Sequence, residues 1–280
     1  SSLENDVKRE NANIDGDTAM GTMLKYGSEG AKQFYEMFIL DPAHAKAHRE
    51  GDIHIHDLDF LTLTTTCCQI DLLQLFSGGF STGHGFLREP NDIRSYSALA
   101  CIAIQSNQND QHGGQSVPNF DYSMAPGVKK TFRKLFRDNL AKALEVYGAD
   151  ENNEVDAAAL TERLERQPGK WACLAGRNGY DEALNAALGE NLGTEAAAKC
   201  VRFARKYADK ETRKATYQAM EALVHNLNTM HSRAGAQIPF SSLNYGTDTS
   251  PEGRLATEQL LLATEAGLGN GETPIFPIHI

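Results

Sequence analysis

Apolar residues recur along this chain with two periods, which predict alternating helices and strands. Residues 126–147 carry large apolar side chains three and four positions apart, as in an amphipathic helix. A second helix is expected from Glu211, and a third, SPEGRLATEQLLLATEAG, after the capping residue Ser250. The apolar runs AQIPFSSLNYG and TPIFPIHI flank this third helix and predict two strands. Strand, crossover helix and strand form a right-handed βαβ unit, so the expected fold class is α/β with parallel strands.

The segment from Gly51 to Asp71, GDIHIHDLDFLTLTTTCCQID, carries most of the candidate chemistry. Its β-branched and apolar residues predict an extended strand in a packed sheet. Side chains alternate between the two faces of a strand, so His54 and His56 would share one face. Cys67 and Cys68 are adjacent and cannot share a face. Only one of the two thiols is therefore expected to face a pocket.

The pattern divides the chain into four regions. Residues 1–50 form an N-terminal arm with helices, and residues 51–147 contain the first strand, a loop and a helix. Residues 148–209 form an alanine-rich helical insertion, and residues 210–280 form a helix followed by the βαβ unit. Within the first region, Ser28 is expected to cap one helix. A second helix should begin at Asp41-Pro42 and end at Gly51.

Composition excludes several classes of protein. Of the 280 residues, 41% are hydrophobic and 23% are charged, which is typical of a soluble globular protein. The net charge of −10 argues against a nucleic-acid-binding surface. No apolar run reaches the roughly 18–20 residues that span a bilayer, and the polar N-terminus is not a secretory signal. Five cysteines, two of them adjacent, do not form a disulfide framework, so a reducing, cytoplasmic setting is expected.

The histidines and cysteines of the central segment each have two interpretations. His54 and His56 could ligate a metal, as in a barrel-type hydrolase, or could hydrogen-bond to nearby backbone and carboxylate groups. The other histidines show no matching pair, so no metal ligand is assigned. A single thiol in a strand is usually a small core residue, although Cys68 before an apolar helix could also be a nucleophile.

Two polar stretches could bind a nucleotide or could simply be solvated. SNQNDQHGGQSVPNFD is expected to be a loop whose amides suit bases and sugars. The helix after it carries Lys129, Lys130 and Lys134, where a triphosphate could rest, so this region alone could be a nucleotide-sensing module. SSLNYGTDTSPEG joins a strand to a helix, and its backbone N–H groups form either an anion site or an ordinary capped helix.

Several long motifs, in order, closely resemble those of the catalytic subunit of anaerobic (class III) ribonucleoside-triphosphate reductases, a family of glycyl radical enzymes. They are HIHDLDF, TTTCCQIDL, QSNQNDQHGGQSVPNFDY, NTMHSRAGAQIPFSSLNYGTDTSPEGR and GLGNGETPIFPIHI. The likeness runs from about Glu4 to Ile280 and is weakest between residues 148 and 208. It implies a ten-stranded α/β barrel made of two five-stranded parallel halves around a finger loop. This chain would supply the first half, with a helical insertion.

The resemblance also implies a reaction, cofactors and partners. Ribonucleoside triphosphates would be reduced to deoxyribonucleoside triphosphates by glycyl and thiyl radical chemistry, with formate as the reductant in many members. A radical S-adenosylmethionine activase generates the glycyl radical, and ATP or deoxynucleotides act as effectors at a homodimer interface. The glycyl radical motif, the CxxC zinc pairs, the finger-loop cysteine and the ATP-binding cone are not in this sequence. The radical residue and the zinc are therefore expected outside this chain, which would not turn over alone.

Site residues follow from the family's motifs. The early-strand cysteine that delivers a hydrogen atom to the substrate falls on the Cys67-Cys68 pair and is placed on Cys67, with Cys68 as the alternative. The other residues implied are substrate contacts in the central segment and at the second strand, and effector contacts in the amide loop and its helix: His54, His56, Ser241, Asn244 and Ser250 for substrate, and Gln108, His112, Gln115 and Lys134 for effector.

Overall fold

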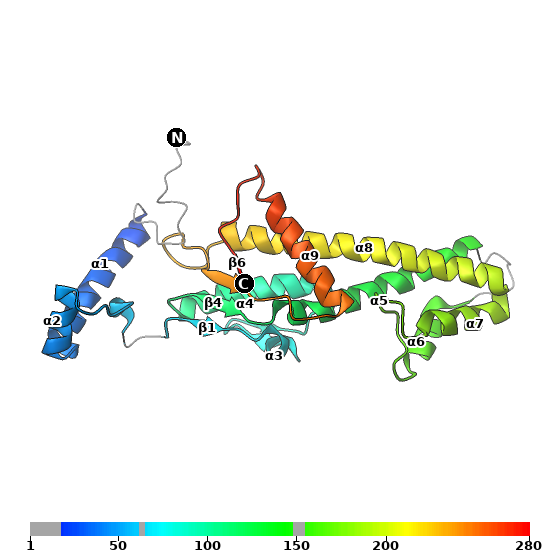
Figure 1. Cartoon of the computed structure of the whole chain (residues 1–280), viewed down its shortest axis with the longest axis horizontal. Coiled ribbons are helices and arrows are strands. Elements are labelled where there is room, and N and C mark those ends of the chain that lie inside the picture. The colour runs from blue at the N-terminus through cyan, green and yellow to red at the C-terminus, as the bar shows by residue number, and fades with distance from the viewer. Residues whose placement is uncertain (1–17, 62–64, 148–154) are drawn as a thin grey trace.

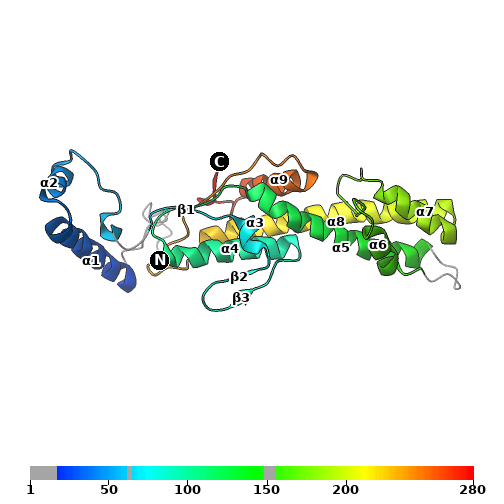
Figure 2. The ribbon, with the colours of Figure 1, turned by 90° about the horizontal axis from the view of Figure 1, so that it is seen from below.

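The computed structural model describes residues 18–61, 65–147 and 155–280 and shows an elongated molecule (Figure 1). Helices α1 (Ala19–Phe34) and α2 (Pro42–Glu50) lie at one end, and α6 (Ala157–Glu165) and α7 (Tyr180–Leu192) at the other. The sheet lies between these ends in both views (Figure 2). Within the described residues, we find no helix with the length and apolar character needed to cross a membrane.

The first helix begins earlier than the sequence predicts. Thr18 caps α1 by accepting a hydrogen bond from the Gly21 amide (3.0 Å). The cap predicted at Ser28 is wrong, because Ser28 lies inside α1. Its hydroxyl instead donates to Asp59 (2.6 Å), which ties α1 to the turn after α2.

The second helix has the predicted bounds. Asp41 accepts a hydrogen bond from the Ala43 amide (2.8 Å) and caps α2, with proline in the first helical position. Gly51 ends the helix with a φ of +84°, a left-handed conformation that glycine adopts without steric cost. Between α1 and α2 the chain makes one π-helical turn, Tyr35–Ile39.

The long strand predicted between Gly51 and Asp71 is wrong. The described part of this segment consists mostly of turns, with a short 3-10 helix at Leu58–Phe60, and only Cys68–Gln69 form a strand, β1. Asp57 has a φ of +50°, which no strand residue adopts, and Leu58 is buried where the turn contacts α1. Leu58 thus buries against a helix instead of between strands, whereas Ile53 and Leu61 stay exposed. Residues 62–64 of the predicted strand lie outside the described residues.

The strands β1, β4 (Gln115–Val117), β5 (Ser241–Leu243) and β6 (Ile278–His279) form a parallel sheet in chain order. The predicted βαβ unit is confirmed as β5, α9 (Pro251–Ala266) and β6, with Ser250 as the N-cap of α9. The fold class is α/β, with helices as the larger part. A separate antiparallel hairpin is formed by β2 (Phe80–Ser81) and β3 (Phe86–Leu87).

The amide-rich stretch predicted as a loop contains a strand. Helix α4 (Ile93–Asp110) extends into it, β4 follows, and α5 (Phe120–Tyr147) begins before the start predicted at Pro126. The strand β4 lies between β1 and β5, where the Gln115 amide donates to the Phe240 carbonyl oxygen (2.9 Å). Only one face of this strand is covered by helices, so it can carry polar residues. For that reason the sequence pattern did not predict it.

Helices α3 (Leu72–Phe76), α4, α5, α8 (Thr194–Thr229) and α9 bury one face of the sheet. Val117 and Leu243 point from the central strands into this core, which also contains buried residues of all five helices. The largest of these are Phe76, Phe120, Met124, Ile93, Ile104 and Leu72. The rigid helical layer fixes the strands from behind and leaves their other face free for a site.

The helical insertion has a core of its own at the far end of the molecule. There α6 and α7 pack on the distal parts of α5 and α8, around Phe132, Phe136, Tyr180 and Leu184. The long helix α8 joins this core to the sheet, so the region boundary expected at residues 209 and 210 falls inside one helix. Arg205 on α8 forms a bidentate ion pair with Asp181 on α7, which holds the two helices together.

Candidate active site

The strand register separates the residues of the two faces of the sheet. One row, on the helix-covered face, contains Cys68, Gln115 and Ser241. The next row, on the open face, contains Gln69, Ser116, Ser242 and Ile278. Burial agrees with this assignment, since the members of the first row are buried or half-buried and those of the second are half-buried or exposed.

The open face forms a groove of about 460 Å³. Its lining combines thiol, hydroxyl and amide groups with an apolar wall: Cys67, Cys68, Gln69, Gly114, Gln115, Ser116, Phe240, Ser242, Ile278 and Ile280. These residues come from all four strands or from the residues just before and after them. The groove therefore offers a few polar groups on a rigid sheet with apolar cover, as small-molecule sites do.

The two adjacent thiols have different surroundings. Cys67 precedes Gln69 by two positions, so alternation directs it to the open face, where it is exposed and lines the groove. Cys68 is half-buried, and its Sγ accepts a hydrogen bond from Asn107 Nδ2 (3.1 Å) on α4. The structure therefore turns the Cys67 thiol toward the groove and the Cys68 thiol toward the covering helices.

Gly113 contacts the thiol-bearing segment at the start of β1. A Cβ atom built on Gly113 would lie 1.5 Å from the Thr66 carbonyl oxygen and 3.2 Å from Cys67 Sγ. Only glycine permits this approach of two backbones. The next residue pairs with β1 directly, since the Cys68 amide donates to the Gly114 carbonyl oxygen (3.1 Å). The loop before β4 thus sets where the thiols lie.

Of the substrate contacts expected at β5, the structure places one on the open face and one behind the sheet. Asn244 lies two residues after Ser242 and accepts a hydrogen bond from Ser116 Oγ (3.1 Å). Ser241 is 1% exposed on the helix-covered face, so it does not reach the groove. Its neighbour Ser242 lines the groove instead. A shift of one residue in the strand register exchanges the faces of Ser241 and Ser242, and the sequence alone does not determine this register.

The turn at Ser250 does not leave free donors for an anion. The Gly246 and Asp248 amides both donate to Asp121 Oδ2 (2.8 Å each), and the Ser250 amide donates to Asp248 Oδ1 (2.8 Å). Ser250 Oγ accepts from the Gly253 amide (3.0 Å) as the helix cap. A phosphate would meet bonded amides and two carboxylates here. The anion site expected at this turn is therefore not supported.

His54 and His56 lie in the turns before β1 and are both exposed. Their rings are 5.9 Å apart, and the nearest carboxylate to His56 Nε2 is Asp57 Oδ2 at 3.3 Å. Neither histidine lines the groove. Among the described residues, we find no group of three or more His, Cys, Asp or Glu side chains placed to hold a metal ion. The metal-dependent hydrolase interpretation therefore has no ligand set in this part of the chain.

The four expected effector residues do not form one cluster. Gln108, His112 and Gln115 lie at the end of α4 and the start of β4, where the side chains of Gln108 and Gln115 are buried. Gln108 bonds to Ser232 (2.6 Å) and Gln115 accepts from Asn107 (2.9 Å). These three residues are parts of the framework behind the sheet.

Lys134 lies elsewhere, in a cavity of about 450 Å³ between α4, α5 and α8. Two further cations, Arg94 and Lys214, line the same cavity. Acidic residues are present as well, namely Asp92, Asp138 and Glu211. The cavity thus offers both charges, and Arg94 also donates to Gln218 across it (2.7 Å).

Two other thiols belong to the cores. Burial raises the pKa of the Cys101 thiol to about 12. Burial also raises the pKa of Cys200, whose sulfur lies 3.6 Å from the Ala143 carbonyl oxygen. Both thiols stay protonated near neutral pH and act as small apolar residues. Of the cysteines that the structure describes, Cys67 is therefore the best placed for chemistry.

Three residues of the site were missed by the sequence analysis. Asn107 bonds to the Cys68 thiol from α4, Gly113 packs against the thiol segment, and Phe240 forms part of the apolar wall. The pair Gly113-Gly114 next to a strand start was a usable signal, because glycine often marks a close approach of two backbones. The contacts of Asn107 and Phe240 are long-range and left no local signal.

Comparisons with known proteins identify the family of this chain. A family model described as anaerobic ribonucleoside-triphosphate reductase matches residues 10–280. Proteins named anaerobic ribonucleoside-triphosphate reductase are 27% identical in Enterobacteria phage T4, over 97% of this chain and 36% of the relative, and 26% identical in Escherichia coli (strain K12), over 96% of this chain and 30% of the relative. The chain thus spans about a third of the length of these relatives. We conclude that the chain belongs to the anaerobic ribonucleoside-triphosphate reductase family.

Proposed function

We propose that this chain is the part of an anaerobic reductase that presents a hydrogen-donating thiol, Cys67, to a ribonucleoside triphosphate. The observation that carries the proposal is the position of Cys67 at the groove, on the open face of a parallel sheet. The order β1–β4–β5–β6 supports an extension of this sheet into one half of a ten-stranded barrel. The open face would then line the barrel's interior.

Hydrogen-atom transfer requires mainly that the thiol be correctly positioned. A thiol S–H bond is weak enough that Cys67 can give its hydrogen atom to a ribose carbon radical, so that a C–H bond forms as the S–H bond breaks. A glycyl radical outside this chain would initiate such chemistry. Overall, the ribose 2′-hydroxyl leaves as water, and formate plus a proton supplies the reducing equivalents and becomes carbon dioxide. The strand fixes the direction of the thiol.

The rest of the groove suits the same role. Phe240, Ile278 and Ile280 form an apolar wall that would keep water and other hydrogen donors from a substrate radical. Ser242 and the Ser116–Asn244 pair offer hydroxyl and amide groups to the ribose or base on the same face. We retain Asn244 as a substrate contact, replace Ser241 with Ser242, and assign no substrate contact to His54, His56 or Ser250.

A second role, effector binding, is favoured by the cavity at Lys134. Three cations from three helices, Arg94, Lys134 and Lys214, could contact the phosphates of a deoxynucleotide. The cavity lies between α4, α5 and α8, away from the groove, so that both ligands could bind together. A second copy of the chain would complete such a site in a homodimer.

An anaerobic activity assay tests the proposal. A reductase that contains this chain, activated by its radical S-adenosylmethionine activase, should convert ribonucleoside triphosphates to deoxyribonucleoside triphosphates and release carbon dioxide from formate. Adding deoxynucleotides to the assay should change the preferred substrate if the Lys134 cavity binds effectors. A reaction without the activase is the control. Formation of the glycyl radical without any deoxynucleotide product would contradict the proposal.

A further inference from the structure

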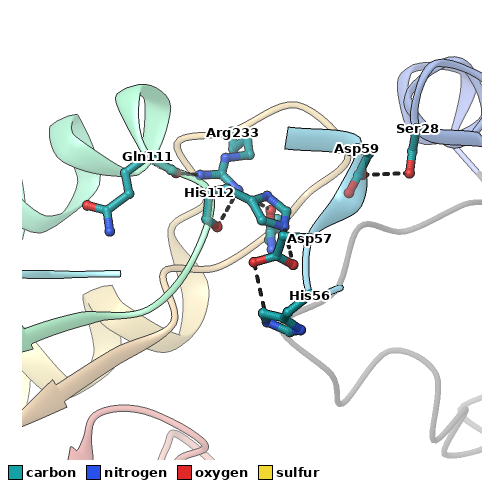
Figure 3. A network of polar contacts seen from close by, with 8 residues as sticks. Ser28, His56, Asp57, Asp59, Gln111, His112 and Arg233 are labelled. Atoms are coloured by element: carbon teal, nitrogen blue, oxygen red, sulfur yellow. Dashed lines mark hydrogen bonds and ion pairs between the residues drawn. The ribbon is translucent and has the colours of Figure 1, made fainter. Parts of the chain in front are cut away.

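Three separate segments of the chain meet around His112, which lies between α4 and β4 (Figure 3). His112 Nε2 lies 3.2 Å from Asp57 Oδ1, and the imidazole stacks on Phe60 with ring centroids 3.9 Å apart and an interplanar angle of 16°. From the loop before β5, Arg233 donates to the His112 carbonyl oxygen (3.3 Å) and to that of Gln111. We call Asp57, Phe60, His112 and Arg233 the His112 clamp.

The clamp holds the imidazole at its edge, through Asp57, and on its face, through Phe60. Within the described residues, His112 Nδ1 is buried without a hydrogen-bond partner, whereas Nε2 faces the Asp57 carboxylate. A proton on Nε2 can be donated to Asp57, while a proton on the buried Nδ1 would have no acceptor. A proton on Nε2 therefore fits the contacts. The stack on Phe60 then restricts its rotation.

Arg233 fixes the backbone that carries this ring. Its guanidinium also donates to the Gln108 carbonyl oxygen (3.0 Å for Nε), so that it satisfies carbonyl groups at and beyond the end of α4. A cation at a helix C-terminus is favourable to the helix dipole as well. The loop between α4 and β4 is thus anchored through both its main chain and the His112 side chain.

The anchored loop leads directly to the thiol. Gly113 follows His112 and packs so close to the thiol segment that a Cβ atom built on it would lie 1.5 Å from the Thr66 carbonyl oxygen and 3.2 Å from Cys67 Sγ. Asp57 and Phe60 belong to the turn that precedes Cys67 in the chain. The clamp therefore joins the turn at Asp57 and Phe60 to the loop that packs against Thr66, next to Cys67. Contacts with the residue before Cys67 limit the positions open to the thiol.

We propose that Asp57 and His112 are positioning residues that hold the Cys67 thiol at the groove through Gly113. The relevance of this positioning to catalysis rests on the proposed function, but the positioning itself does not. The exposed His56, although 3.3 Å from Asp57, contributes little because solvent screens that contact. The device is a hydrogen bond, so an uncharged acceptor in place of the carboxylate should preserve it.

Thiol reactivity in the full chain tests the proposal without any turnover. Alkylation rates of Cys67 and Cys68 with iodoacetamide are measured by mass spectrometry, with peptide fragmentation between the two residues. The wild-type chain should react faster at the exposed Cys67 than at the half-buried Cys68. In Asp57→Ala the ratio of the two rates should fall by about tenfold, because the loosened segment exposes Cys68 as well.

Matched variants separate positioning from a general loss of structure. Asp57→Asn keeps an acceptor oxygen and tolerates the left-handed backbone, so its ratio should stay within about twofold of wild type. Cys173, outside the sheet region, reports global unfolding through its own rate. If Asp57→Ala unfolds the chain, Phe60→Leu, which removes the stack, should lower the ratio with Cys173 unchanged.

Two results would overturn the inference. One is an unchanged Cys67 to Cys68 ratio in every variant whose Cys173 rate remains that of wild type. The other is a ratio in Asp57→Asn that falls as far as in Asp57→Ala, which would show that the charge, and not the hydrogen bond, matters. A reductase that fails the activity assay would leave both readouts unaffected, so the two proposals fail separately.

Discussion

Replacing Cys67 with serine should lower nucleotide reduction by roughly 10³-fold or more in a reductase that contains this chain. The serine O–H bond is far stronger than a thiol S–H bond, so serine cannot give a hydrogen atom to a ribose carbon radical. The change is small in volume and lies on the exposed face of the sheet, so folding should be preserved. Substrate binding and the glycyl radical signal should therefore persist while product formation is lost.

The adjacent cysteine is the matched control. Cys68 bonds to Asn107 on the helix-covered side, and a serine hydroxyl can accept the same amide hydrogen bond. Cys68→Ser should therefore retain activity within a few-fold of wild type. The measurement is product formation by both variants under identical anaerobic conditions. An active Cys67→Ser protein with an inactive Cys68→Ser protein would move the role to Cys68.

Replacing Gly113 with alanine should be costly both to stability and to the position of the thiol. The new Cβ would lie 1.5 Å from the Thr66 carbonyl oxygen, a backbone atom that cannot rotate away. One of the two backbones must move, and overpacking of this kind costs about 1 to 3 kcal/mol. Chemical denaturation should show this loss, and iodoacetamide should show an altered Cys67 rate.

The control for this variant is Gly85→Ala. Gly85 lies between β2 and β3, a Cβ there would contact nothing within 4 Å, and its φ is not positive. It should change the free energy of unfolding by no more than about 0.5 kcal/mol. Equal stability of the Gly113 and Gly85 variants would show that the loop before β4 does not constrain β1.

Local patterns predicted the βαβ unit of β5, α9 and β6 well. Ser250-Pro251 marked the start of α9 because a capping side chain and a first-position proline act within one turn. The Asp41-Pro42 and Gly51 bounds of α2 were read from the same kind of signal. Parallel pairing of β5 and β6 followed from the length of the crossover. The helix bounds were set within a few residues, and the strand pairing within one continuous segment.

The errors share the opposite property. The segment around Leu58 has a strand-like composition but buries its apolar side chain against α1, which the local pattern does not reveal. The strand β4 was missed because its residues are polar and its partners, β1 and β5, come from distant parts of the chain. The choice between Cys67 and Cys68 needed the register with β4 and the contact with Asn107. The sequence thus showed the candidate cysteines, but not which of the two thiols faces the groove.

Protection of thiols by substrate tests the central claim, that Cys67 faces the ribonucleotide, most directly. The reductase that contains this chain is alkylated anaerobically with and without a saturating ribonucleoside triphosphate, and labels at Cys67 and Cys68 are quantified separately. We predict that substrate slows the labelling of Cys67 and leaves that of Cys68 unchanged. Protection of Cys68 alone, or of neither thiol while substrate is bound, would contradict the assignment.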